Sequence, residues 1–337
     1  MRTVFAAKMV GCCIWGRSWV GWRRGPGVRA ALAAAGFGTK AGHQLQPQGS
    51  SKRSGPRRDQ PCPGLLRPED LSREELVDVL TAAVVDQKGK PGDLTLLSVL
   101  PELSQSLGLG ERELQIVRAA GKDSSGLVLL SSCPQTASRL QKFFTHSCRV
   151  QRPTATYCAI TDGIPATSEG KIQAALKLEH IDGANLVVPV KPPSRKDILE
   201  GVKRTLSHFR VVATGSGCAL VQLQPLTVFP SQLQVHMVLQ LCPVLGDHMY
   251  SARVSTVLGQ RFLLPAESTK PRKQVLDEAL LRCLRLTPSQ AAQLPLHLHL
   301  HSLLLPGPRP QDTPIELLAS LPPYFTKTLQ CLGLRQQ

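Results

Sequence analysis

The chain has 337 residues, enough for one large domain or two small ones, each with an apolar core. Its ten cysteines form no Cys-x-x-Cys pair, and no apolar run is long enough to span a membrane, which argues against a zinc ribbon, a disulfide scaffold or a membrane-spanning helix. Of the net charge of +16, eleven units lie in residues 1–58, which contain no Asp or Glu. The mildly basic remainder permits RNA or another polyanion as a partner without requiring one.

The first 58 residues are rich in Arg, Gly, Ala and Ser. Basic residues from Lys8 onward interrupt the apolar start, which argues against a secretory signal and is typical of a mitochondrial transit peptide. The sequence therefore predicts a transit peptide and basic lead-in over residues 1–58, and a location in the mitochondrial matrix. A disordered basic tail or a weak nuclear signal between residues 52 and 58 is the alternative.

A short helix is expected next. Ser72 and Glu75 stand three residues apart before an apolar run, which is a capping box, and the helix should end near Asp86. Because residues 87–93 have the composition of a turn, residues 59–92 are predicted to be a helix and linker. A short apolar piece follows at 94–100.

A turn followed by a fully apolar stretch marks the centre of the chain. Residues 121–126 are Gly-Lys-Asp-Ser-Ser-Gly, and residues 127–130 are Leu-Val-Leu-Leu. This pattern is typical of a loop that enters a strand buried on both faces. Polar residues on such a loop are well placed for chemistry, although they also suit an ordinary solvated turn.

Three further elements follow in chain order. Residues 134–146 have the apolar spacing of a helix. Tyr157 lies in an alternating stretch, 156–161, which predicts a strand that ends in a hairpin turn at residues 162–163. Residues 194–209 again have helical spacing, with a capping box at the start.

Basic residues gather on this last predicted helix. Lys196, Lys203 and Arg204 would lie on its polar side, where they could contact RNA phosphates without reading the RNA sequence. A solvated helix face is the alternative. Beyond it, residues 208–213 and 218–224 alternate across Gly-Ser-Gly, which predicts a hairpin with one buried face.

Three histidines near the end of the chain alternate with leucines. In a strand, His297, His299 and His301 would point to one face, where they could bind a metal. No carboxylate or cysteine lies nearby in the sequence, so we expect no metal site here.

Several stretches, in order, resemble motifs of the RluA-like pseudouridine synthases. Residues 118–126 correspond to the family motif His-Arg-Leu-Asp-x-x-Thr-Ser-Gly and share its final Ser-Gly. Residues 155–159 correspond to the motif Lys-x-Tyr-x-Ala and keep its Tyr and its final Ala. Residues 227–236 are similar to Thr-Gly-Arg-x-His-Gln-Ile-Arg-x-His, and residues 246–250 match Gly-Asp-x-x-Tyr. The resemblance implies an α+β pseudouridine synthase fold over residues 93–325, with a mixed, mainly antiparallel sheet, a central cleft and flanking helices. Residues 326–337 would be a tail.

The resemblance also implies a reaction that needs no cofactor and no metal. In that family the target uridine is flipped from its stack, and an Asp carboxylate, paired with an Arg, assists cleavage of the glycosidic bond. Here the Asp position holds Gly121 and the Arg position holds Gln234. Asp123, on the same loop, is the candidate catalytic carboxylate, with a simple turn role as the alternative. The other residues implied to line the cleft are Tyr157, Gln232, Leu233, Gln234 and His236.

The expected function is therefore pseudouridine synthesis in mitochondrial RNA, with mRNA as the expected class. Mitochondrial transcripts or ribosomal RNA, and other mitochondrial RNA-processing proteins, are the expected partners. Because Gly121 and Gln234 remove both members of the Asp–Arg pair, an RNA-binding pseudoenzyme of the same fold is the alternative. A protein-interaction scaffold is a third interpretation.

Overall fold

The computed structural model describes residues 4–9, 96–106, 109, 113–121, 123–181, 183–190, 201–266, 269–307 and 313–334. The helix expected near residues 72–86, Lys122 and Lys196 lie outside these ranges. Within them, no helix is both long and apolar enough to cross a membrane. The helices are α2 (Leu96–Ser106), α3 (Pro134–Arg149), α5 (Gln232–Leu239), α6 (Glu278–Leu284), α7 (Pro288–Ala291), α8 (Pro323–Cys331) and the 3₁₀ helix η2 (Ser251–Arg253).

Most strands join one ten-stranded sheet with the order β1-β3-β11-β4-β8-β7-β5-β6, to which β2 adds beside β3 and β12 beside β11. The pairing is antiparallel except between β3 and β11, which run parallel, so the predicted mixed, mainly antiparallel sheet is confirmed. A separate hairpin joins β9 and β10. The strands are β1 (Val4–Met9), β2 (Gln115–Arg118), β3 (Ser125–Ser131), β4 (Ala155–Asp162), β5 (Glu169–Ile181), β6 (Ala184–Val190), β7 (Lys203–Gly215), β8 (Cys218–Pro225), β9 (Val254–Val257), β10 (Gln260–Leu263), β11 (Leu298–Leu305) and β12 (Ile315–Leu318).

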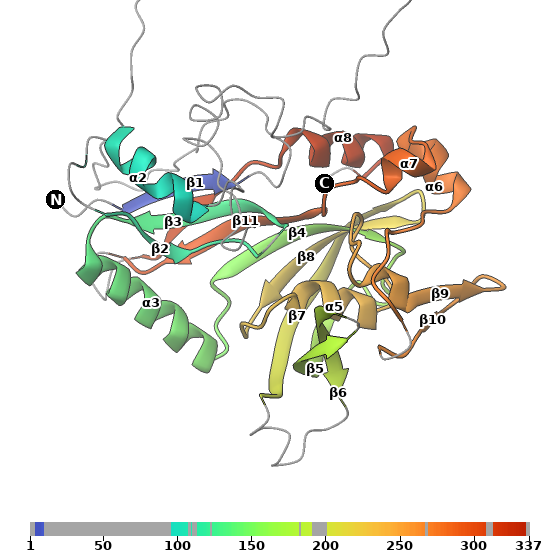
Figure 1. Cartoon of the computed structure of the whole chain (residues 1–337), viewed down its shortest axis with the longest axis horizontal. Helices are drawn as coiled ribbons and strands as arrows, with labels where there is room; N and C mark the ends of the chain where they lie inside the picture. Colours follow the sequence, from blue (N-terminus) through green and yellow to red (C-terminus); the bar gives the residue numbers. More distant parts are fainter. Residues whose placement is uncertain are drawn as a thin grey trace, which may run out of the picture.

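Helices lie against the sheet at several separate places (Figure 1). Helix α3 lies beside β2 and β3, while α5 lies over β5, β6 and β7. Helices α6, α7 and α8 gather at the opposite end of the molecule. The boundary predicted at residue 325 falls inside α8, which buries Phe325 and Leu329, and β1 lies inside the segment predicted to be a transit peptide.

Strand β3 is the buried strand that the sequence predicts. Residues 127–130 are completely inaccessible to solvent because β3 is covered on both faces. At its start, Gly126 has φ +130°, and a Cβ there would collide with the backbone of Leu300 on β11. The glycine of the Ser-Ser-Gly stretch is therefore required by the close parallel pairing of two strands.

The predicted helix over residues 194–209 is wrong where the structure describes it. Residues 203–215 form β7, which pairs along its length with β5 and β8. The buried residues Thr205, Ser207 and Phe209 alternate with more exposed ones, the period of a strand. Pairing with neighbouring strands on both sides has therefore outweighed the helical spacing of the apolar residues in this segment.

The strand around Tyr157 is confirmed, but two details of its prediction are wrong. Almost all of β4 is buried rather than alternating, because β8 and β11 flank it and side chains cover both faces. Residues 162–163 do not form a hairpin turn, since the next strand, β5, pairs with β6 and β7. The chain instead leaves the sheet here, where Asp162 binds Arg261 at 2.6 Å.

Other elements agree with the sequence more closely. Helix α3 matches the predicted helix at 134–146 and continues to Arg149. The predicted hairpin of β7 and β8 is confirmed, with Ser216 and Gly217 at positive φ in its turn. Most of the apolar piece at 94–100 belongs to a helix, α2.

Candidate functional site

Helix α5 carries four of the predicted site residues, and buried polar contacts fix it against β7. Gln232 donates to Ser207 Oγ at 2.9 Å and accepts from Thr227 Oγ1 at 3.0 Å. His236 Nε2 shares a hydrogen bond of 2.8 Å with Thr205 Oγ1. Both side chains lie inside the fold rather than facing solvent. Their role is therefore to hold α5 in place and so to position the neighbouring residues of this helix.

Burial also sets the charge of this helix. His236 is completely inaccessible, and burial lowers its pKa from 6.5 to about 4. The imidazole is therefore neutral at physiological pH. Leu233, on the adjacent face of α5, packs into the same apolar core as Tyr157 and the buried strand β3.

Gln234 points from α5 to a buried carboxylate. Its Nε2 atom donates to Asp247 Oδ1 at 3.3 Å, and the backbone N–H groups of Met249 and Tyr250 donate to the same oxygen at 3.0 Å each. Asp247 is 1% exposed, and its Oδ2 atom has no hydrogen-bond partner within the described part of the chain. Burial raises the pKa of Asp247 from 3.8 to about 6, although these hydrogen bonds oppose the rise.

The Gly-Asp-x-x-Tyr stretch that contains Asp247 is a tight structural turn. Gly246 has φ +80°, and a Cβ there would collide with the carbonyl oxygen of Pro295. Tyr250 is buried, and its hydroxyl accepts a hydrogen bond from the Val187 N–H at 3.3 Å. The motif therefore ties α5, β6 and the loop before β11 together.

The loop before β3 brings a second carboxylate to this region. Ser124 N donates to the Gly121 carbonyl at 3.1 Å, which closes the turn, and Asp123 occupies its exposed corner with φ +62°. Burial raises the pKa of Asp247 and lowers that of His248; the charge of Asp123 adds to the first shift and opposes the second. The Asp123 carboxylate therefore lies within electrostatic range of the Gln234–Asp247 contact, so the structure brings together the loop and the helix that the motifs predict.

Gly121 leaves room for a side chain. It has no positive φ, it is exposed, and among the described residues a Cβ placed on it would meet only Ser124 Oγ, at an ordinary contact distance of 3.7 Å. The absence of an Asp at this position is therefore not forced by crowding.

Tyr157 lies on β4 and is 7% exposed. Burial raises the pKa of its hydroxyl, and the charge of Arg118 opposes that rise. The Arg118 guanidinium also lies 5.4 Å from the centre of the Phe144 ring. Arg118 therefore brings a positive charge to the region of Tyr157, a role that the sequence interpretation missed although Arg118 begins the first motif stretch.

The histidines on β11 are engaged in hydrogen bonds. His299 Nδ1 and Ser125 Oγ share one of 2.8 Å, and Tyr324 donates to the same Ser125 oxygen at 3.2 Å. His297 Nε2 and Thr328 Oγ1 share another, of 2.9 Å. Among the described residues no group of three or more His, Cys, Asp or Glu could hold a metal ion. The contacts with Ser125 anchor the start of β3, and with it the Asp123 loop, whereas the His297 contact holds α8.

The predicted RNA-binding residues do not share one surface. Lys203 and Arg204 are neighbours on β7, so their side chains point to opposite faces of the sheet. Lys203 Nζ donates to the Val228 carbonyl at 3.0 Å, on the side of α5. The grouping of these two residues on one helix face was therefore wrong.

A mixed sheet in which a polar loop meets a Gln-Leu-Gln-x-His helix and a Gly-Asp-x-x-Tyr turn defines the class of this protein as a pseudouridine synthase fold. Residues 82–238 match the family model described as RNA pseudouridylate synthase. The chain belongs to this family.

Individual relatives agree along the whole chain. It is 77% identical to the mitochondrial mRNA pseudouridine synthase RPUSD3 of Homo sapiens, over 100% of both chains. It is 75% identical to the protein of the same name from Bos taurus, over 98% of this chain and 100% of the relative. Among solved structures, human RNA pseudouridylate synthase domain containing 4 matches with a TM-score of 0.58 and 25% identity, over 77% of this chain and 96% of the other. The names of these relatives support a mitochondrial location for the chain.

Proposed function

We propose that this protein isomerises uridine to pseudouridine in mitochondrial RNA, with mRNA as the substrate class and the matrix as its location. Family membership and the names of its RPUSD3 relatives support this proposal. Other mitochondrial RNA-processing proteins are the partners such a role implies. The basic first segment of the chain is consistent with import as a precursor.

The observation that carries the proposed chemistry is the position of Asp123. Its carboxylate is exposed on the loop that enters β3, within electrostatic range of Asp247. We assign to Asp123 the carboxylate role in cleaving the glycosidic bond, because a group that contacts a flipped base must be reachable. Asp247 suits that role poorly, since it is buried and its Oδ1 accepts three hydrogen bonds that hold the turn. Tyr157 and Leu233 are the proposed apolar support beneath the base.

One observation favours a second function, an RNA-binding pseudoenzyme. The Asp and Arg positions of the family hold Gly121 and Gln234, and Gln234 makes an uncharged contact with Asp247. Loss of only one member of such a pair would leave the charge of the other uncompensated. Loss of both leaves a fold that is stable without the pair, and such a fold could bind RNA without reacting.

Conversion of uridine by the purified protein separates these functions. We expect the wild type to form pseudouridine in a mitochondrial transcript, and Asp123→Ala and Asp123→Asn each to lower the rate at least about 100-fold. Asn tolerates the left-handed backbone of this turn, so it removes the charge and keeps the loop. Glu278→Gln, at an exposed position on α6, is the control.

Each contrary outcome has a distinct meaning. If Asp123→Asn is active and Asp123→Ala is not, Asp123 has a turn role and another group performs the reaction. If well-folded wild-type protein converts no uridine but binds the transcript with the salt dependence of phosphate contacts, the pseudoenzyme is correct.

A further inference from the structure

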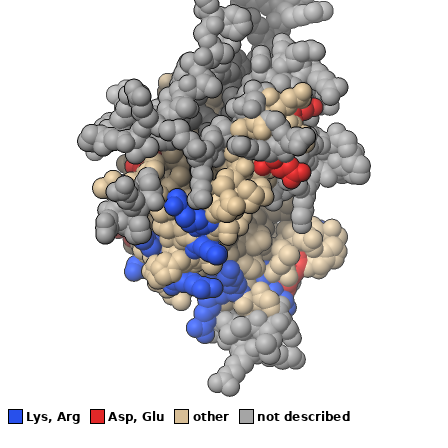
Figure 2. Space-filling view, turned by 90° about the vertical axis from the view of Figure 1, so that its left-hand side faces the viewer, with Lys and Arg blue, Asp and Glu red and all other residues tan. Residues whose placement is uncertain are grey.

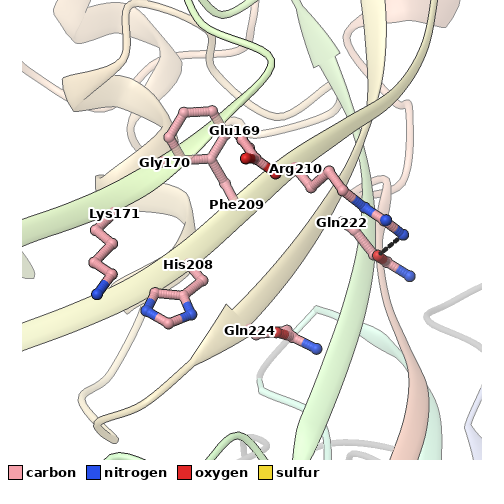
Figure 3. Close-up of a pocket in the computed structure, with 8 residues that line it drawn as sticks. All are labelled: Glu169, Gly170, Lys171, His208, Phe209, Arg210, Gln222 and Gln224. Atoms are coloured by element: carbon pink, nitrogen blue, oxygen red, sulfur yellow. Dashed lines mark hydrogen bonds between the residues drawn. The ribbon is translucent and has the colours of Figure 1, made fainter.

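A groove of about 570 Å³ lies across β5, β7 and β8 (Figure 3). Paired residues of the three strands form two polar rows along it. Lys171, His208 and Gln224 make one row, and Glu169, Arg210 and Gln222 make the other. Because residues paired across a sheet point to the same side, these six side chains share one face.

This face is the one opposite α5. On β7, Thr205 and Ser207 point to α5 and bind His236 and Gln232, whereas His208 and Arg210 occupy the alternate positions. The groove is therefore separated from the candidate site by the thickness of the sheet. Nothing in the reaction assigned to Asp123 uses it.

The groove has the chemistry of a surface that binds a nucleic acid strand. Lys171 and Arg210 are exposed cations, and Arg210 Nη2 donates to Gln222 Oε1 at 2.9 Å, which orients both side chains. Gln224 donates to Thr156 Oγ1 at 3.1 Å and retains further donor and acceptor capacity. The Nε2 atom of His208 is buried and has no hydrogen-bond partner among the described residues. Such an orphaned polar atom indicates a missing ligand or water.

The charge of the surroundings favours an anion. Among the residues that the structure describes, Glu169 is the one carboxylate that lines the groove, against Lys171 and Arg210, and Arg204 lies on the same face of β7. Figure 2 shows Lys and Arg gathered on the lower part of one side of the molecule, with Asp and Glu sparse among them. With two cations against one carboxylate, the groove favours the approach of a polyanion.

We propose that the groove binds a single-stranded segment of the RNA whose uridine occupies the candidate site, a proposal that rests on the function proposed above. Lys171 and Arg210 contact phosphates, while Gln222, Gln224 and His208 meet the edges or faces of unpaired bases. Sheet faces that combine cations with planar side chains are a recurrent way of binding single strands, because unpaired bases expose both their edges and their rings. An acidic peptide could satisfy the cations but would leave the two amides and the imidazole without matched partners.

The test compares a long transcript fragment with a short oligonucleotide that carries only the target uridine and its nearest neighbours. We expect Lys171→Glu and Arg210→Glu together to weaken binding of the long RNA at least about tenfold. The slope of log affinity against log salt should fall by about 0.7 for each lost phosphate contact. Binding of the short RNA should not change. Lys171→Glu alone should also weaken binding of the long RNA, and its matched control is Lys327→Glu, an equal charge change at an exposed position of α8.

Crosslinking gives an independent measurement that does not depend on a variant folding. Photoreactive uridines placed along the flanking RNA should crosslink to peptides that contain residues 169–171 or 208–210. Unchanged long-RNA affinity in the double variant, or crosslinks confined to the loop at 121–124 and to α5, would overturn the groove as an RNA surface. Failure of the isomerase proposal would appear separately, as absent pseudouridine with intact groove-dependent binding.

Discussion

Gly121 occupies a position where a side chain fits but none is present. A Cβ there meets Ser124 Oγ at 3.7 Å, an ordinary contact, so Gly121→Asp should fold. Gln234→Arg would replace the uncharged contact with Asp247 by an ion pair. We expect the double variant to increase pseudouridine formation at least about tenfold, because a positioned carboxylate with a cationic partner contributes that much or more.

The two single variants are the controls for this prediction. Gly121→Asp alone adds a carboxylate near Asp123 and Asp247 without a new cation, so it should lower stability and raise activity little above that of the wild type. Gln234→Arg alone should lower the pKa of Asp247, observable by NMR titration of its carboxyl. Equal activity of the double variant and the wild type would mean that this position no longer faces the substrate.

Gly126 is the second residue with a measurable consequence. A Cβ would collide with backbone atoms of Leu300, and φ is +130°. We therefore expect Gly126→Ala to lower the free energy of unfolding by about 2–5 kcal/mol, through backbone strain and overpacking together. Gly217→Ala is the matched control, since Gly217 also has positive φ, but a Cβ there would meet no described atom within 4 Å beyond its chain neighbours. Urea unfolding of both variants measures the difference.

At the scale of elements, the sequence predicted correctly the elements whose residue pattern fits only one kind of structure. Four apolar residues after a turn could only be buried, and β3 is buried on both faces. Residues 194–209 were misassigned because Ile198, Val202 and Leu206 have helical spacing. One partner of β7 is β8, which follows it directly in a hairpin, but the other is β5, which lies earlier in the chain with β6 between them.

The same limit applies to the candidate site. The resemblance to family motifs indicated Gln234, Asp123 and the Gly-Asp-x-x-Tyr turn, and in that turn the positive φ of Gly246 gives the motif a local physical reason. The hydrogen bond of Gln234 to Asp247 and the approach of Arg118 to Tyr157 join different elements. No local pattern in a single sequence encodes such contacts, and the groove on the reverse face depends on the register of three strands.

At the scale of the whole molecule, three buried groups among the described residues have large pKa shifts in the acid range and so affect how stability depends on pH. Burial lowers the pKa values of His236 and His297 from 6.5 to about 4, so each contributes stability above about pH 6.5 that is lost as the pH falls toward 4. Asp247 has the opposite sign, since its raised pKa of about 6 contributes stability at low pH that is lost as the pH rises from 3.8 through 6. Between about pH 4 and about pH 6, the effect of the two histidines outweighs the opposite effect of Asp247, so a fall in pH destabilises the fold.

Removing the opposing group tests this balance. Asp247→Asn leaves the histidines with lowered pKa values unopposed, so between about pH 4 and about pH 6 the free energy of unfolding should rise more steeply with pH than in the wild type. Urea unfolding at several pH values measures both slopes. Equal slopes would show that Asp247 titrates alike in the folded and unfolded chain.

Strand β7 serves two surfaces with alternate residues, Thr205 and Ser207 toward α5, His208 and Arg210 toward the groove. Deleting a single residue in its first half would exchange the two sets, because every side chain beyond the deletion would turn through the sheet. The anchoring of α5 and the polar groove would then fail together. Both surfaces therefore constrain the length of this strand. A substitution of one exposed side chain, by contrast, leaves the alternation of the two sets intact.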